Sequence, residues 1–442
     1  GEWRIDVGDV TEASPRSTEA TPTMIVGNQP FRATGRTPDQ AISVVNRYIE
    51  ALPMGGLLSV IVPRSLLATN AAQALRKHLL NQFDIYEIWE LPAGEFKGTS
   101  QETAVLMGRK RIQTELPRTV VAWRRSSKGR TDEIDTLTQS DWLRDPRAAI
   151  RSPLALRLDT HLGHYPQLIE HVPKSSRSQG ITPGIDGKGD VLDHHEPDAV
   201  PYLFGRKGMR PFSIPWSVHP HWLRYDSPRL QWPRRESADL FRSKKVVISR
   251  LVTWGSAWRV RAAIDEDGIF PSDQFIVLSP DSPLSMEFVA ALFNSALANC
   301  WLKLVYPSNT VSMDQILQIP VPRGLASEAV RRAEEIARFL SKGQHPHGSL
   351  EGRQLAELTL ELDAAVYDAF DVPAWLRREV TEHFLWLGDK RDGFDGPMVA
   401  APNDSEQTAP PQFTDEDSRR MHDLFEKRQE QRLSVREADE LD

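Results

Sequence analysis

The interpretation of this chain rests on the stretch Met24-Ile25-Val26-Gly27-Asn28-Gln29-Pro30-Phe31. Its first three residues are apolar strand formers, and the run then ends abruptly in a polar turn that a proline stiffens. An active-site loop leaves a buried strand in this way. Gly27 permits close backbone approach, Asn28 offers a side-chain carbonyl and amide, and Phe31 offers a flat ring. Together they predict a binding site for a planar ring that carries an amine.

The residues after this turn alternate between helical and strand-like patterns. A helix is expected over 38–52, a strand over 57–63, a helix over 71–80, and strands over 84–91 and 102–107. The continuous apolar run at 57–63 is typical of a parallel strand with both faces covered. The fold class is therefore α/β, and this part is expected to form the second half of a doubly wound, Rossmann-like sheet.

Asn28, Pro30 and Phe31 resemble the Asn-Pro-Pro-Tyr/Phe motif of amino-directed, gamma-class DNA methyltransferases, which use S-adenosylmethionine to methylate adenine at N6. In that family the target adenine is flipped out of the duplex, its amine donates to the Asn side chain and to the next backbone carbonyl, and the aromatic ring stacks on the base. The resemblance, which covers roughly residues 1–110, implies these roles for Asn28, Gln29 and Phe31, with Pro30 fixing the turn. It also implies Phe96 as a second wall of the base pocket.

One residue departs from the motif, since Gln29 stands where the family has proline. Glutamine still has a backbone carbonyl, but it lacks the fixed φ that holds that carbonyl in place. Two hypotheses follow. The chain is a component of an active adenine-N6 methyltransferase, or it is a catalytically silent, methyltransferase-like subunit that recognises DNA.

The cofactor site of such enzymes lies on an initial strand, glycine-rich turn and helix. No such unit precedes Asn28 in this sequence, and the spaced glycines Gly184, Gly187 and Gly189 are interpreted as a turn in a polar loop. The resemblance therefore implies S-adenosylmethionine as the cofactor, with a site supplied largely by another polypeptide or by a missing N-terminal half.

Composition sets further limits. The 442 residues are 40% hydrophobic and 26% charged, and no apolar run approaches the roughly 18–20 residues that cross a bilayer. We expect a cytoplasmic protein that does not enter a membrane. The single cysteine, Cys300, excludes internal disulfides and a thiolate zinc cluster, and its apolar surroundings favour inert packing.

Residues 150–325 differ in composition, with Pro, Gly, Trp and short strand-like runs in alternation. This succession is similar to the target-recognition domains of single-chain restriction-modification and phage-defence methyltransferases, including those of BREX-like and DISARM-like systems. In such enzymes this domain follows the catalytic one and reads the DNA sequence. The resemblance implies double-stranded DNA as the partner of this region.

The net charge of −7 hides a local excess of positive charge, because thirteen Lys or Arg residues stand against three acids between positions 201 and 261. Such a field suits phosphate contact. A solvated basic face is the alternative interpretation, and for each aromatic in this stretch core packing is favoured over base stacking. The DNA-binding candidates are Arg206, Lys207, Arg210, Arg224, Arg234, Arg235, Lys244, Lys245, Arg250 and Arg259.

The predicted organisation is a catalytic segment over 1–125, a recognition domain over 150–325, a helical segment over 326–397 and a flexible acidic tail over 398–442. Residues 111–150 are expected to be irregular, with an exposed basic loop at 124–130. Two rival chemistries are disfavoured. The adjacent histidines of 193–196 seldom converge on one metal ion, and a nuclease-like set of Asp39, Glu95 and Lys97 is too widely spaced. No metal is expected.

Overall fold

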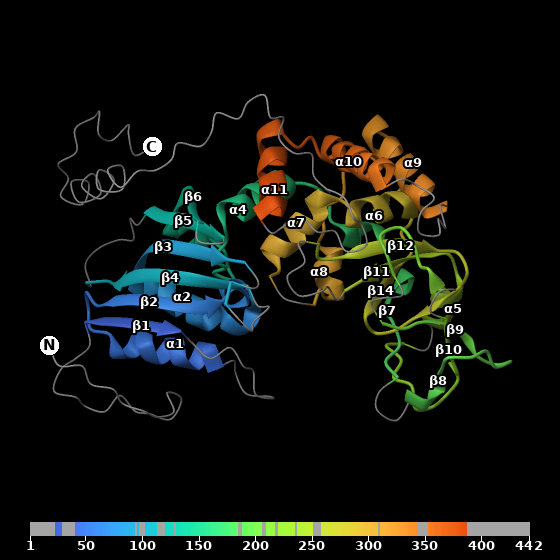
Figure 1. Cartoon of the computed structure of the whole chain (residues 1–442), viewed down its shortest axis with the longest axis horizontal. Helices are drawn as coiled ribbons and strands as arrows, with labels where there is room; N and C mark the ends of the chain where they lie inside the picture. Colours follow the sequence, from blue (N-terminus) through green and yellow to red (C-terminus); the bar gives the residue numbers. More distant parts are fainter. Residues whose placement is uncertain are drawn as a thin grey trace. The chain divides into compact units, whose positions relative to one another are not determined.

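The computed structural model describes residues 23–28, 40–92, 95–96, 102–112, 120–127, 130–183, 188–205, 209–216, 220–234, 237–250, 258–307, 310–342 and 352–386. These residues belong to one compact unit. Figure 1 shows a sheet at the amino-terminal end of the described chain, followed by two smaller sheets and a group of helices.

The first sheet contains six strands in the order β1-β2-β4-β3-β5-β6. Their bounds are β1 Met24–Asn28, β2 Leu57–Pro63, β3 Phe83–Leu91, β4 Thr103–Lys110, β5 Val120–Ser127 and β6 Arg130–Thr138. β1 pairs parallel with β2, and β3 pairs parallel with β5, whereas β4 and β6 run antiparallel to their neighbours. β1, β2, β3 and β5 therefore point the same way, and the fold is a mixed α/β sheet with helices.

Two helices, α1 (Gln40–Ala51) and α2 (Gln73–Gln82), lie along one face of this sheet (Figure 1). Their apolar stripes pack with the inward side chains of the strands into one core, for example Val45 and Ile49 with Val60. The strand at 57–63 has the predicted bounds, but its outer residues are less covered than expected. Leu57 is exposed while Leu58 and Val60 are buried, because the helices cover one face only.

The expectation for residues 111–150 is wrong. Residues 120–138 form the hairpin β5 and β6, which extends the sheet beyond residue 125, and α3 (Gln139–Arg144) follows directly. The basic residues of β5 suggested a loop because charge usually marks solvated chain. Here the strand carries them into ion pairs, Arg124 with Glu87 and Arg125 with Glu90.

Helix α4 (Pro153–Leu162), capped by Ser152, leads from this sheet to the second region. Two four-stranded sheets follow, with the orders β13-β9-β10-β8 and β12-β11-β14-β7. The strands are β7 Arg177–Gln179, β8 Val191–Leu192, β9 Val200–Leu203, β10 His221–Leu223, β11 Lys245–Ser249, β12 Arg261–Asp265, β13 Phe270–Pro271 and β14 Phe275–Leu278, with α5 (Ser237–Arg242) before β11. The apolar patterns of 245–250, 258–264 and 275–278 predict strands, and these correspond to β11, β12 and β14.

The apolar pattern of 286–304 predicts one helix, but the structure has two, α6 (Met286–Phe293) and α7 (Ala296–Val305). The Ser295 hydroxyl ends one helix and begins the next, because it accepts a hydrogen bond from the Ala298 amide at 3.3 Å. Asn294 bonds Ala262 of β12 through both of its side-chain groups, at 3.0 and 2.7 Å. Polar residues at the break thus tie this helix pair to the neighbouring sheet.

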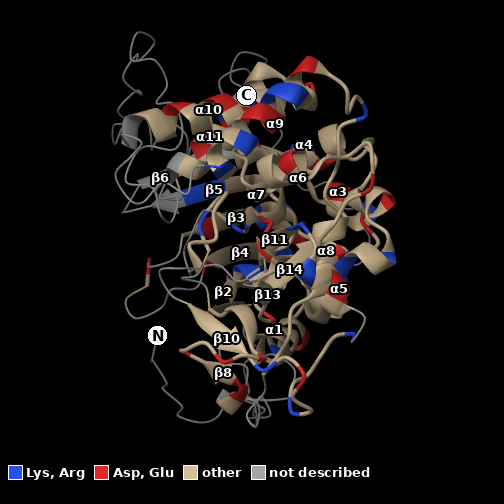
Figure 2. Ribbon diagram, turned by 90° about the vertical axis from the view of Figure 1, so that its right-hand side faces the viewer, with Lys and Arg blue, Asp and Glu red and all other residues tan. Residues whose placement is uncertain are grey.

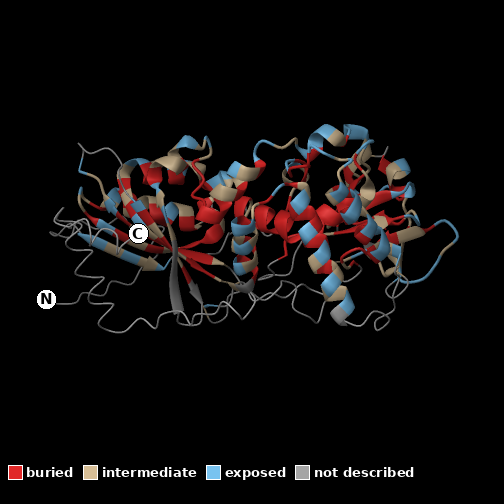
Figure 3. Cartoon of the chain, turned by 90° about the horizontal axis from the view of Figure 1, so that it is seen from above, coloured by how far each residue is buried: buried red, intermediate tan, exposed pale blue. Residues whose placement is uncertain are grey.

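The remaining helices are α8 (Met313–Leu317), α9 (Glu328–Lys342), α10 (Gly352–Ala369) and α11 (Ala374–Trp386). Ser327 caps α9, since its hydroxyl accepts a hydrogen bond from the Val330 amide at 3.3 Å. Figure 3 shows buried residues gathered along the central helices and exposed residues over the outer turns. Within the described chain no single helix is long and apolar enough to cross a bilayer. The pair α6 and α7, which is bent by 60°, meets the requirement by length and composition only.

Candidate active site

The carboxyl ends of β1, β2, β3 and β5 meet at one edge of the sheet. Their last residues are Asn28, Pro63, Leu91 and Ser127. In open α/β sheets ligands bind in the crevice outside this edge. We therefore call it the carboxyl edge and take it as the candidate active site.

Asn28 is the last residue of β1 and lies opposite Ile61 of β2. Its side chain is exposed, so the amide is accessible from solvent at the carboxyl edge. Phe96 follows β3 by a few residues and is half-buried. The other three predicted residues of the motif, Gln29, Pro30 and Phe31, lie outside the described residues.

Buried charges behind this edge form a group that we call the junction cluster: Arg64, Glu90, Glu102, Arg125, Arg259 and Lys303. Arg64 directly follows β2, and its two terminal nitrogens contact Oε1 of Glu90 at 3.0 Å and Oε2 of Glu102 at 2.9 Å. Nζ of Lys303, from α7, lies 2.6 Å from Oε1 of Glu102. The cluster therefore joins the sheet to the second region.

Arg125 continues the cluster towards α11. Its Nε lies 3.4 Å from Oε2 of Glu90, and its Nη2 lies 3.0 Å from Nδ1 of His383. The guanidinium also stacks over the ring of Trp386, 5.0 Å from the centroid. Because an arginine nitrogen can only donate, Nδ1 of His383 is the acceptor and carries no proton.

Burial and the neighbouring charges shift the pKa values of the groups in and beside the cluster. Burial alone would raise the pKa of Glu102, but Lys303 and Arg64 outweigh it and hold that pKa at about 2. Burial lowers the pKa of His383 well below its usual value, and the charges of Arg125, Arg64 and Lys303 lower it further. Burial raises the pKa of the Cys300 thiol to about 12, in agreement with its predicted inert packing.

Sequence reasoning missed the junction cluster. The one available signal was the position of Arg64, a charged residue immediately after an apolar strand. The rest depends on residues far apart in the chain, because Lys303 comes from α7 and His383 from α11.

The predicted DNA-binding residues lie in several environments. Arg224 pairs with Glu196 at 2.6 Å, and Lys244 contacts Glu266 at 2.8 Å and Glu287 at 3.6 Å. Arg234 donates to the carbonyls of Lys174 and Arg177, and Arg250 to those of Val311 and Asp273. Arg210 is half-buried, and Arg206, Lys207 and Arg235 lie outside the described residues. Figure 2 shows acidic and basic residues interspersed on this side of the molecule.

Two of the predicted residues face the interior. The Lys245 ammonium is fully buried, where it pairs with Asp265 and donates to the carbonyl of Phe241. Arg259 is 8% exposed and belongs to the junction cluster. The Lys245 side chain is therefore unavailable to a phosphate on the surface, and the Arg259 side chain faces the cluster. The nearby aromatics pack as expected, with Trp258 and Phe241 in hydrophobic cores.

The disfavoured metal motif forms a local exposed group. Nδ1 of His194 lies 3.0 Å from Asp193 and its Nε2 lies 3.5 Å from Glu196, which also binds Arg224. Over the described ranges, no three His, Cys, Asp or Glu side chains are arranged to hold a metal ion. For the nuclease-like set, Glu95 is described and exposed, whereas Asp39 and Lys97 are not described.

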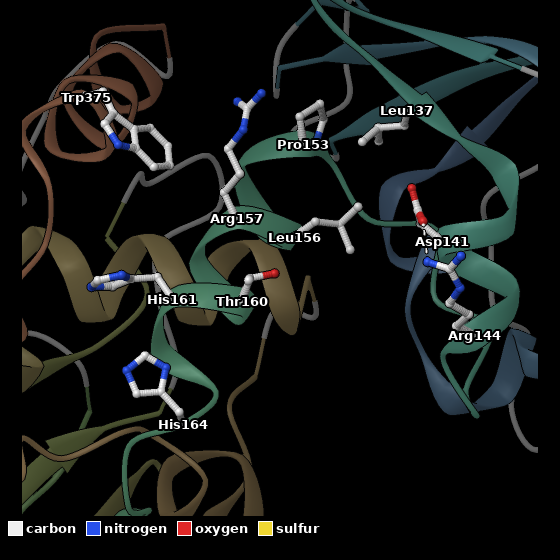
Figure 4. Close-up of a pocket in the computed structure, with 10 residues that line it drawn as sticks. All are labelled: Leu137, Asp141, Arg144, Pro153, Leu156, Arg157, Thr160, His161, His164 and Trp375. Atoms are coloured by element: carbon white, nitrogen blue, oxygen red, sulfur yellow. Dashed lines mark hydrogen bonds and ion pairs between the residues drawn. The ribbon is translucent and has the colours of Figure 1, made fainter.

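A cavity of about 610 Å³ lies along α4, between β6, α3 and α11 (Figure 4). Its charged lining is already paired, with Arg157 bonded to Glu379 at 2.8 Å and Arg144 to Asp141 at 3.0 Å. Leu137, in its wall, pairs with Val121 at the start of β5. The cavity therefore extends to the amino end of the sheet, so we do not assign the active site to it.

No protein-family model matches the sequence, and comparison with curated proteins also gives no match. Among solved structures, the type IIL restriction-modification enzyme MmeI in complex with DNA has a TM-score of 0.54 at 12% identity, over 83% of this chain and 57% of that one. The type IIG restriction endonuclease BpuSI gives 0.34 at 15% identity, over 82% and 56%. A nuclease-deletion mutant of the type ISP restriction-modification enzyme LlaGI with a DNA substrate mimic gives 0.42 at 12%, over 73% and 42%. The chain thus shares the fold of MmeI and spans 57% of its length.

Proposed function

We propose that this chain is the base-holding and DNA-reading part of an S-adenosylmethionine-dependent DNA adenine-N6 methyltransferase of a restriction-modification or phage-defence system. The observation that supports it most is Asn28, an exposed side chain at the carboxyl edge of a sheet. The fold is shared with MmeI, a restriction-modification enzyme whose structure was solved with DNA. The proposal combines the position of Asn28 with the resemblance of its neighbours to the methyltransferase motif.

In the proposed reaction Oδ1 of Asn28 and the backbone carbonyl of Gln29 accept hydrogen bonds from the exocyclic amine of a flipped adenine. Both bonds hold the amine with its lone pair aimed at the methyl group that S-adenosylmethionine supplies. Phe31 and Phe96 enclose the base, and Pro30 fixes the turn. Positioning and electrostatics do most of the catalytic work, because the amine needs no strong base.

The outer side of β1 supports a partner that carries the cofactor site. Met24 and Val26 are 58% and 71% exposed, although both are large apolar residues of a strand that ends in the candidate site. Contiguous exposed apolar surface marks interaction sites. A second polypeptide, or another part of the same protein, would cover this surface and supply the S-adenosylmethionine pocket.

The second candidate is a catalytically silent subunit that recognises DNA. The residue Gln29 favours it, because the backbone carbonyl at that position lacks the fixed φ of proline. DNA recognition would then reside in the region from 150 to 325, while another chain transfers the methyl group.

The test is transfer of labelled methyl from S-adenosylmethionine to DNA by the complete protein with its partners. We expect Asn28→Ala to lower the rate by on the order of 100-fold or more while DNA affinity is retained. The matched control is Asn81→Ala, an exposed asparagine on α2 at the amino end of β3. Equal rates for Asn28→Ala and the parent would assign this chain to the silent class.

A further inference from the structure

The ion pairs of the junction cluster leave one cation without a counter-ion. Both oxygens of Glu102 are hydrogen-bonded, to Arg64 and Lys303. Both oxygens of Glu90 are in ion pairs, Oε2 with Arg125 and Oε1 with Arg64, although Oε1 makes no hydrogen bond. Arg259 is the fourth cation of the cluster. Its Nε and Nη2 are buried without a hydrogen-bond partner.

Arg259 is held in this position by its chain neighbours. Its amide donates to Oδ1 of Asn299 at 2.7 Å, one residue before Cys300 on α7. The preceding residue, Trp258, stacks on Phe384 of α11, with ring centroids 4.7 Å apart. The main chain therefore fixes the guanidinium beside the face of α7 that carries Lys303, where its charge helps to lower the pKa of that lysine.

No other group of the cluster can supply the missing negative charge. The Cys300 thiol is protonated, because burial raises its pKa to about 12. His383 is neutral and already accepts from Arg125. The side-chain oxygen of Asn299 already accepts hydrogen bonds from the backbone amides of Arg259 and Val260. Burial lowers the pKa of Arg259 to about 10, so this side chain is still a cation at neutral pH.

Further unpartnered donors lie in the cluster on the side of Arg125. If Nδ1 of His383 accepts from Arg125, its Nε2 carries the proton, and that atom is buried without a partner. Nε1 of Trp386 is likewise buried and unpartnered, and Arg125 stacks over its ring. An interior with four cations against two carboxylates, and with several unpartnered donors, is complementary to an anion.

We propose that the junction cluster binds a phosphate-type oxyanion, with the guanidinium of Arg259 as its principal contact. The planar fork of an arginine donates two parallel hydrogen bonds to such a group. The site lies behind the carboxyl edge, where Arg64 follows β2. The anion is either free phosphate or a phosphate of bound DNA, and only the second source depends on the proposed function.

The first experiment follows thermal unfolding of the full chain in inorganic phosphate or sulfate against chloride at equal ionic strength. We expect a saturable rise in Tm with phosphate, because a ligand of the folded state stabilises it. Arg259→Met should abolish the saturable rise, and Arg259→Lys should weaken it. Arg331→Met, an exposed residue of α9, should keep it. No saturable rise in the parent, or an unchanged rise in Arg259→Met, overturns the site.

The second experiment distinguishes the source. If the anion is a DNA phosphate, saturating free phosphate weakens DNA binding by the parent more than chloride does at equal ionic strength, and Arg259→Met loses this difference. If it is a free anion, phosphate stabilises the parent and leaves DNA affinity unchanged. Asn28→Ala should retain the phosphate response, so failure of the methyltransferase proposal and failure of this site are separable.

Discussion

Lys303 Nζ lies 2.6 Å from Oε1 of Glu102, so a lysine of helix α7 is bound to the residue that precedes strand β4. The lysine side chain is 4% exposed and the glutamate 20%. This buried contact links the sheet that carries Asn28 with the region expected to read DNA. The two regions are therefore held together by charge as well as by apolar packing.

Removing one partner of this ion pair should lower the stability of the folded protein. Lys303→Met leaves Glu102 with Arg64 alone in a buried site, and we expect the free energy of unfolding to fall by about 3 kcal/mol. Chemical denaturation of the full chain measures this loss. The double variant Lys303→Met with Glu102→Gln should recover part of it, because the glutamine leaves no carboxylate without its lysine partner.

A matched control for this pair is Arg331→Met, which removes an exposed pair with Glu328 at 2.7 Å on α9. Exposed pairs are worth roughly 0–1 kcal/mol, so little change is expected. If Lys303→Met were as mild as this control, the contact between the two regions would not contribute to stability.

Stability should fall with pH through His383. Burial and the charges of Arg125, Arg64 and Lys303 keep its folded pKa well below its usual value, whereas the unfolded chain takes up a proton near pH 6.5. The contribution of His383 is then fully present above about pH 6.5 and is lost as the pH falls below it. Thermal unfolding measured from pH 7.5 to pH 5 follows this loss.

His383→Gln separates this effect from general acid sensitivity. A glutamine oxygen can accept from Arg125 but does not take up a proton in this range. The variant should therefore show a flatter Tm profile between pH 6.5 and pH 5, while His195→Gln, at an exposed residue, should keep the parent profile. An equally steep profile in His383→Gln would assign the pH sensitivity to other groups.

The elements nearest the candidate site were predictable because their signals are local. The apolar run over 57–63 follows Gly55 and Gly56 and ends in a proline, and β2 has these bounds. Asn28 could be recognised as the end of a strand from its neighbours alone. The hairpin β5 and β6 was missed because its strands gain their stability from partners distant in sequence, as Arg125 does from Glu90 and His383.

The adjacent lysines Lys244 and Lys245 show the same limit for the basic stretch. In the sequence they are equivalent, but Lys245 points inward to Asp265 and Lys244 points outward. Burial lowers the pKa of Lys245 and raises the pKa of Asp265, so the pair is held by its mutual attraction. All five residues of β11 are buried and Lys244 lies just before them, so the difference depends on the packing around the strand, which no local pattern specifies.

Substitution of Lys245 should lower the free energy of unfolding much more than substitution of Lys244. Lys245→Met should lower the free energy of unfolding by about 3–5 kcal/mol, because it leaves the Asp265 carboxyl buried without its cation. Lys244→Met should change it by less than about 1 kcal/mol, since that side chain is 45% exposed. Denaturation of both variants in one buffer tests the difference, and a similar cost for the two would contradict the assigned orientations.

The members of the basic stretch that are not fully buried give the sharpest test of DNA contact. If Lys244 and Arg210 contact phosphates, each substitution by Ala should reduce the slope of log affinity against log salt by about 1 and weaken binding to all sequences alike. Lys244 must exchange Glu266 and Glu287 for phosphate, and this exchange is favourable only where DNA supplies several charges at once. Affinity titrations from about 50 to 200 mM salt, with Arg331→Ala as the control, measure the slope. Unchanged slopes in both variants would mean that this basic face is solvated, and that any DNA contact of the chain lies on other residues.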